Sequence, residues 1–344
     1  MIWVILLAAF FWLLGAMMRM PFRKRLVPIA VLLALVALAQ FFLPPGHPLT
    51  IRFGGTLFGW GMAVLVLAAL VAYGFGLRAL KARAPEASSP SQPGPFSDTE
   101  LDRYARHIVL REIGGQGQKA LKDAQVLVIG AGGLGSPALL YLAAAGVGTI
   151  GVVDDDVVDN SNLQRQVIHR DADIGKPKVF SAEAAMKAQN PAITVRPYQR
   201  RLTGDNAADL FAGYDLILEG TDNFDTKYLV NKVAAGLGIP VVGGALSQWE
   251  GQISTWDPAR GGPCYQCVFP QAPAPGLAPS CSEAGVVGPL PGVIGAMMAV
   301  ETIKELTDAG EGLRGRLMIY DAMYAETRVI RTKKRADCPV CSHL

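Results

Sequence analysis

The stretch QVLVIGAGGLGSPALLYLAAAGVGTIGVVD, residues 125–154, decides the fold. Its first five residues are an apolar, β-branched run, which predicts a buried strand. The G-x-G-x-x-G of residues 130–135 follows, then an Ala- and Leu-rich helix over 136–145 and a second strand over 149–153. In this setting the glycines let backbone N–H groups approach a phosphate at the helix N-terminus. Asp154, 19 residues after the last glycine, is placed to bind ribose hydroxyls.

The same alternation of strands and helices continues further along the chain. Strands are expected at 193–198, 216–218 and 240–242, and helices at 206–212 and 226–237. This order predicts an α/β fold with a Rossmann-like, doubly wound and mostly parallel sheet. At this point the ligand could still be NAD, because the same loop binds dinucleotides. The candidate phosphate-binding glycines are Gly130, Gly132, Gly133 and Gly135.

Polar residues that suit phosphate chemistry follow the glycine loop. Arg165 and Lys178 could stabilise phosphate charge, and Asp222, just after an expected strand, could hold Mg²⁺. Hydride transfer needs no such set. Each residue also has a simpler reading, as a surface charge or a helix cap. Together, behind the glycine loop, they favour phosphate chemistry over NAD. The other candidate nucleotide-binding residues are Ser161, Asn162, Leu163, Gln164 and Asn223.

The first 84 residues differ from the rest in being mostly apolar. Three uncharged stretches, about 1–18, 26–43 and 57–77, are long enough to cross or nearly cross a ~30 Å hydrocarbon layer, and predict three transmembrane helices. Basic residues flank them in a pattern that predicts a multi-pass protein of the inner (cell) membrane with a cytoplasmic catalytic domain. Residues 85–97 predict a flexible linker. A net charge of +3 gives no indication of nucleic-acid binding.

The five cysteines all lie in the C-terminal half. Cys264 and Cys267 form one C-x-x-C pair, and Cys338 and Cys341 form another. Four thiolates suit a closed tetrahedral zinc site, which would tie the C-terminal tail to the central domain. Free or redox-active thiols are the alternative. Cys281 lies apart from the pairs, beside a Pro-rich segment, and is either a reactive nucleophile or an unpaired surface thiol.

Several strings occur in order along the chain, including RYARHIVL (103–110), VVDDDVVDNSNLQRQ (152–166), GKPK (175–178), EGTDN (219–223) and CSEAGVVGPLPGVIG (281–295). Together they resemble the ThiF/MoeB/HesA family, bacterial relatives of ubiquitin-activating (E1) enzymes. The resemblance implies that residues 98–344 form an E1-like adenylation domain. It also implies a reaction, in which the C-terminal glycine carboxylate of a small ubiquitin-like protein attacks the α-phosphate of ATP. The products are an acyl adenylate and pyrophosphate.

Roles for single residues follow from their positions in the family motifs. The resemblance implies that Gly133 lies under the phosphates and that Asp154 and Asn162 hold the ribose and nearby groups. It implies that Arg165 and Lys178 neutralise the phosphates and that Asp222 binds Mg²⁺.

Two further residues have implied roles outside the nucleotide site of their own chain. Arg106 resembles an arginine that reaches the phosphates of the partner subunit, which implies a functional homodimer. In some members the cysteine at the position of Cys281 forms a covalent link with the carrier.

The resemblance also implies the partners. The carrier is expected to be a MoaD- or ThiS-like sulfur carrier protein ending in Gly-Gly, in molybdopterin or thiamin biosynthesis, with a separate protein as sulfur donor. Two other readings remain open. One is an NAD(P)-dependent oxidoreductase built on the same glycine loop. The other is a membrane-tethered, non-catalytic adaptor for a ubiquitin-like protein.

Overall fold

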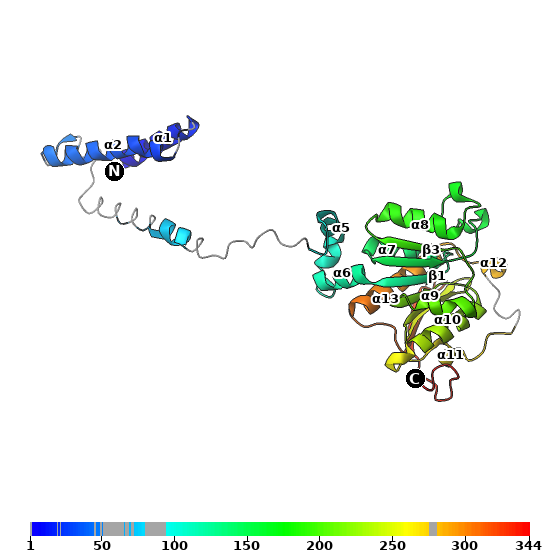
Figure 1. The fold of residues 1–344 in the computed structure, drawn as a ribbon. Coiled ribbons are helices and arrows are strands. Elements are labelled where there is room, and N and C mark those ends of the chain that lie inside the picture. The colour runs from blue at the N-terminus through cyan, green and yellow to red at the C-terminus, as the bar shows by residue number, and fades with distance from the viewer. Residues whose placement is uncertain are drawn as a thin grey trace. The chain divides into compact units, whose positions relative to one another are not determined.

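The structure, a computed structural model, divides the chain into two compact units, Met1–Gln92 and Pro93–Leu344. Figure 1 shows the fold of each unit. The residues that the structure describes are 2–18, 20, 22–44, 46–48, 50, 65, 69, 72–79, 94–274 and 281–344.

The first unit contains a pair of contacting helices, α1 (Ile2–Met17) and α2 (Phe22–Phe42). With 16 residues, α1 extends roughly 24 Å, which is less than the ~30 Å of a bilayer core. Three consecutive basic residues, 23–25, lie in the first turn of α2, and Pro28 lies inside it. Among the described residues no helix has both the length and the apolar character to cross a membrane.

This finding corrects the predicted membrane anchor. The transmembrane helices predicted at 1–18 and 26–43 are wrong, and so is the multi-pass inner-membrane location that was derived from them. Most of the third predicted span, 57–77, lies outside the described residues, although 72–79 are helical. Most of the predicted linker, 85–97, also lies outside them.

Within residues 94–274 and 281–344, eight strands form one sheet in the order β3-β2-β1-β4-β5-β6-β7-β8. The neighbours from β3 to β5 pair in parallel, and those from β5 to β8 pair antiparallel. The sheet is therefore mixed, and its antiparallel half was not predicted. The strands are β1 (Gln125–Ile129), β2 (Thr149–Val153), β3 (Thr194–Tyr198), β4 (Leu216–Glu219), β5 (Val241–Leu246), β6 (Glu250–Trp256), β7 (Arg316–Asp321) and β8 (Glu326–Arg331).

Helices cover both faces of the sheet, so the parallel strands β1, β2 and β4 are buried on both sides (Figure 1). On β1, Val126 and Val128 belong to one core cluster. Leu127 and Ile129 belong to the other, because successive strand residues point to opposite faces. The first face is covered by α7 (Gly135–Ala145), α8 (Lys178–Gln189) and α13 (Pro289–Thr307), and the second by α9 (Gly204–Phe211) and α10 (Phe224–Leu237).

The second unit contains four further α-helices among its described residues. They are α5 (Asp98–Ile108), α6 (Gly114–Asp123), α11 (Tyr265–Val268) and α12 (Cys281–Ala284). Ser97 and Glu100 form a capping box that starts α5. Tyr104 of α5 is buried where α7 and α8 end, and the Asn190 side chain donates to its hydroxyl oxygen at 2.7 Å. This contact fixes α5 at the C-terminal ends of α7 and α8.

Candidate active site

The glycine loop, residues 130–135, joins β1 to α7 in a tight turn. Gly130 has a φ of +92°, which favours glycine. A Cβ on Gly135 would lie 1.9 Å from the carbonyl oxygen of Gly130. The loop therefore needs glycine at its first and last positions, and it opens directly into the N-terminus of α7, where backbone N–H groups favour an anion.

Asp154, directly after β2, supports this loop from the side. Its carboxylate accepts hydrogen bonds from the backbone N–H of Ala131 at 2.8 Å and of Asp156 at 2.9 Å. Partial burial raises the pKa of Asp154, although the nearby charge of Lys178 and these two N–H groups favour the carboxylate. Asp154 thus links the ends of β1 and β2 at the edge where α/β sheets bind ligands.

Arg165 lies against the glycine loop. Its guanidinium donates to the side-chain oxygen of Asn162 at 2.8 Å and to the carbonyl oxygen of Ser161 at 3.3 Å. A Cβ on Gly133 would meet Arg165 Cγ at 3.7 Å and Pro291 Cβ at 3.0 Å. The fold therefore brings Arg165, Gly133 and the first turn of α13 together. The predicted residues Ser161, Asn162, Leu163, Gln164 and Arg165 lie in or directly after the short 3-10 helix Asn160–Asn162.

Lys178 is the first residue of α8, and its Nζ lies 2.7 Å from the Oδ2 of Asp156. The two partners differ in environment, because the Lys178 side chain is 5% exposed and that of Asp156 is 66% exposed. Lys178 is thus a buried cation with a solvated counter-ion, close to the Asp154 carboxylate whose pKa it affects.

The loop of residues 220–223, between β4 and α10, packs directly on the glycine loop. A Cβ on Gly130 would lie 3.2 Å from Cγ2 of Thr221. Asp222 is exposed beside this contact. The side chain of Asn223 accepts from the N–H of Thr226 at 3.0 Å and so caps α10. The helix cap is therefore Asn223, which leaves the Asp222 carboxylate available for another role.

One predicted catalytic residue, Arg106, is not brought to this loop. Arg106 is exposed on α5, whose Tyr104 packs just past the C-terminus of α7. The glycine loop lies at the other end of α7, which is 11 residues or roughly 16 Å long. Cys281 is the first residue of α12, a segment held to the rest by the hydrogen bond from Gln248 Nε2 to the carbonyl oxygen of Ala284 at 2.8 Å.

Three buried side chains near the loops were missed in the sequence. His169 Nε2 donates to the carbonyl oxygen of Ala131 at 2.9 Å, and its Nδ1 lies 3.0 Å from Ser181 Oγ. Burial lowers the pKa of His169, although its bond to the Ala131 carbonyl favours the charged form. Glu219 and Lys227 form an ion pair at the base of the 220–223 loop. Glu219 lies in the EGTDN string and Lys227 eight residues after it, but their pairing, like the contact of His169 with the Ala131 carbonyl, appears only in the folded structure.

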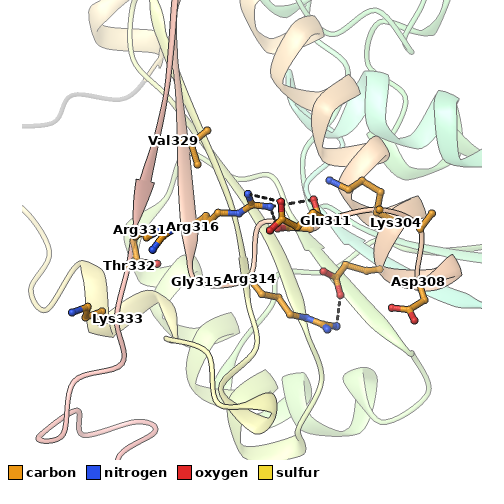
Figure 2. Close-up of a pocket in the computed structure, with 14 residues that line it drawn as sticks. Lys304, Asp308, Glu311, Arg314, Gly315, Arg316, Val329, Arg331, Thr332 and Lys333 are labelled. Atoms are coloured by element: carbon orange, nitrogen blue, oxygen red, sulfur yellow. Dashed lines mark hydrogen bonds and ion pairs between the residues drawn. The ribbon is translucent and has the colours of Figure 1, made fainter. Parts of the chain in front are cut away.

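A cavity of about 700 Å³ lies away from these loops, between the C-terminal end of α13 and strands β7 and β8 (Figure 2). Pro291, in the first turn of α13, contacts the glycine loop, and the helix then runs roughly 28 Å. Figure 2 shows the Arg316 guanidinium pointing toward Glu311, 3.2 Å away, and Arg314 is paired with Glu305. The cavity is thus separate from the candidate nucleotide site, and much of its charge is neutralised internally.

The four paired cysteines form one buried cluster. Their sulfur atoms all lie within 4.8 Å of one another. A tetrahedral zinc ion with Zn–S bonds of 2.3 Å would place its sulfurs about 3.8 Å apart. The observed Sγ–Sγ distances fit that value. They are 3.9 Å for Cys264–Cys267, 3.6 Å for Cys264–Cys338 and 3.4 Å for Cys267–Cys341.

Donor groups around the cluster suit thiolates. The Asn231 side chain donates to Cys264 Sγ at 3.7 Å, and the Arg335 N–H donates to Cys267 Sγ at 3.4 Å. Burial would raise the pKa of Cys338, but backbone N–H groups of its own turn lower it to about 7. A cluster of four converging sulfurs, with no disulfide among them, is the donor set of a structural metal site.

A glycine loop at a helix N-terminus, with a buried cation and an arginine beside it, defines a nucleotide-binding α/β protein. The chain belongs to the ThiF family, which matches residues 104–340.

Curated relatives carry consistent names. The chain is 50% identical to the SAMP-activating enzyme E1 of Haloferax volcanii over 71% of this chain and 89% of the relative. It is 48% identical to a sulfur carrier protein adenylyltransferase of Thermus thermophilus over 72% of this chain and 92% of that protein. It is also 51% identical to the probable adenylyltransferase/sulfurtransferase MoeZ of Mycobacterium tuberculosis, over 72% of this chain and 64% of MoeZ.

Solved structures share the fold at lower identity. E. coli MccB, in complex with MccA-N7isoASN, superposes with a TM-score of 0.63 at 22% identity, over 70% of this chain and 74% of MccB. PaaA superposes with a TM-score of 0.61 at 22% identity, over 85% and 91%. At this identity, these likenesses show a shared fold.

Proposed function

We propose that this chain is an ATP-dependent adenylyltransferase that activates the C-terminal glycine of a ubiquitin-like sulfur carrier protein. The observation that carries the proposal is the convergence of Arg165, Lys178 and Asp222, from three separate segments, around one glycine loop. Relatives at about half identity are named as enzymes of this kind. The carrier is proposed to be MoaD- or ThiS-like, in molybdopterin or thiamin biosynthesis.

In this reaction a carboxylate oxygen of the carrier attacks the α-phosphorus of ATP, the bond to the β-phosphate oxygen breaks, and pyrophosphate leaves. An α-carboxyl group, with a pKa of about 3.5, is already ionised at neutral pH, so the step needs no general base. The chain then has to position two anions and neutralise their charge. Gly133 N–H, Arg165 and Lys178 are proposed to do this at the phosphates, and Asp154 with Asn162 at the ribose.

Metal ions fit two places. Asp222 is proposed to hold Mg²⁺, which neutralises phosphate charge when bound. Its free and exposed carboxylate supports that role. The cluster of four cysteines is proposed to hold a structural Zn²⁺, as its sulfur spacing supports.

A homodimer is proposed to complete the site. Arg106 lies at the end of α7 that is far from its own glycine loop, so a second copy would have to bring its Arg106 to the phosphates.

Two further proposals concern the carrier. Cys281 is proposed to form a transient covalent link with the carrier. The sulfur itself is proposed to come from a separate donor protein.

The test is carrier-dependent exchange of radiolabelled pyrophosphate into ATP, with a panel of small proteins ending in Gly-Gly. Wild type is expected to exchange with at least one carrier. Asp222→Asn is expected to lose about a hundredfold, the usual effect of removing one transition-state charge partner. Asp225→Asn, a nearby exposed acid on α10, is the matched control and is expected to keep activity. ATP binding without exchange, or preferential binding of NAD(P), would overturn the proposal.

A further inference from the structure

We infer that Glu219 and Lys227 are positioning residues, whose buried ion pair holds the 220–223 loop and so aims Asp222 at the nucleotide. The inference rests on the proposed adenylation and adds to it two residues whose pairing no sequence motif predicts. Neither residue has to touch the nucleotide for this role.

The ion pair connects strand β4, helix α10 and strand β5. Glu219 is the last residue of β4, and Lys227 lies in the first turns of α10. Lys227 Nζ lies 2.5 Å from Glu219 Oε2, and the side chains are only 6% and 5% exposed. The same ammonium donates to the carbonyl oxygen of Gly244 on β5 at 2.6 Å. The Lys227 ammonium therefore connects α10 to β4 and to the neighbouring strand β5.

The loop between the two partners is held at both ends. The second carboxylate oxygen of Glu219 accepts from the backbone N–H of Thr221 at 2.8 Å and from its hydroxyl at 2.5 Å. The N–H of Gly220 donates to the carbonyl oxygen of Ile129 at 3.1 Å. Asp222 therefore lies between Thr221, which Glu219 holds, and Asn223, which caps α10. It is also next to the contact of Thr221 with Gly130.

Stability alone does not call for such a pair. Removing two charges from water is costly, and well-packed apolar residues often replace a buried ion pair without loss of stability. An ammonium with three donors can, however, fix a carboxylate and a carbonyl oxygen at the same time. That geometry suits a clamp on a loop that carries a catalytic carboxylate.

The first experiment measures pyrophosphate exchange against Mg²⁺ concentration in the full-length chain. Lys227→Met is expected to lower the maximal rate by about a hundredfold, the effect of a misplaced catalytic group, and to raise the Mg²⁺ concentration for half-maximal rate. Lys227→Arg keeps the cation and is expected to restore most of the rate. Lys232→Met removes an exposed lysine of the same helix and is expected to change neither quantity.

A second variant separates positioning from folding. Lys227→Met leaves Glu219 buried without a partner, so it is also expected to lower the unfolding midpoint. The double variant Glu219→Gln/Lys227→Met has no buried charge and is expected to unfold near the wild-type midpoint. It is still expected to show a low rate and a raised Mg²⁺ requirement.

The outcomes are distinguishable. A folded double variant with wild-type rate and Mg²⁺ response would overturn the positioning role and leave the adenylation proposal standing. A Lys227→Arg variant as inactive as Lys227→Met would also overturn it. A wild-type chain without exchange for any carrier would instead overturn the proposed function, and this inference with it.

Discussion

Gly135, the last residue of the glycine loop, has no room for a side chain. We expect Gly135→Ala to destabilise the fold by about 1–3 kcal/mol, because its Cβ would overlap the Gly130 carbonyl oxygen, and to weaken ATP binding. Thermal unfolding and ATP titration measure the two effects. Gly115→Ala in α6 is the control, since nothing lies within 4 Å of its added Cβ. Equal midpoints for both variants would show that the loop can relax.

His169 is expected to make stability depend on pH. Burial lowers its pKa below the ordinary value of 6.5, so in the window below about pH 6.5 the unfolded chain binds a proton that the folded chain does not. Stability therefore falls as the pH drops through that window. We expect His169→Gln to flatten this part of the curve of unfolding midpoint against pH. His343→Gln, at an exposed site, should not, and an equal slope in both variants would contradict the assignment.

Sequence reasoning reached some site residues and missed others for a physical reason. Gly130 and Gly135 belong to a contiguous motif, and their need for glycine is local. Lys178 was found within the GKPK string, but its pairing with Asp156 was not predicted. Glu219 and Lys227 meet only when β4 is followed by a helix that folds back on it, so their pairing is a property of the tertiary structure.

Elements were predicted well where the pattern was strong. The strands at 125–129 and 149–153 lie where they were predicted, because short β-branched runs between turn signals can only be buried strands here. The antiparallel half was missed. Every residue of β8 is exposed, so it shows no alternation of buried and polar residues. The apolar runs near the N-terminus were read as membrane spans from run length, which does not fix where a helix ends.

The cysteine cluster joins two distant segments, and its loss is expected to act on both. We expect the wild-type chain to carry about one zinc ion, and Cys338→Ser to lose it and to unfold several degrees lower, because the metal closes the loop between the two cysteine pairs. Elemental analysis and thermal unfolding measure this. Ser342→Ala, exposed in the same turn, is the control. A metal-free wild type with the same midpoint as Cys338→Ser would contradict a zinc role.

We expect the protein to act as a homodimer whose active sites each use a residue of the partner subunit. In a purified heterodimer of Arg106→Ala and Asp222→Asn chains, one site would combine an intact Asp222 with an intact Arg106 from the partner chain. We expect about half of the wild-type exchange rate from this heterodimer, although each variant alone is inactive. Two affinity tags allow its purification. An inactive heterodimer would mean that Arg106 does not act across the subunits.

We expect Lys178 to exchange its Asp156 partner for a phosphate when a nucleotide binds. The lysine is buried and the aspartate is largely in water. An arriving phosphate can take the place of Asp156 while Lys178 never loses an anionic partner, and the released carboxylate returns to solvent at little cost. A neutral nucleoside offers no anion for that swap. We therefore expect the pair to favour a charged triphosphate over a neutral nucleoside, before any contact with the base is made.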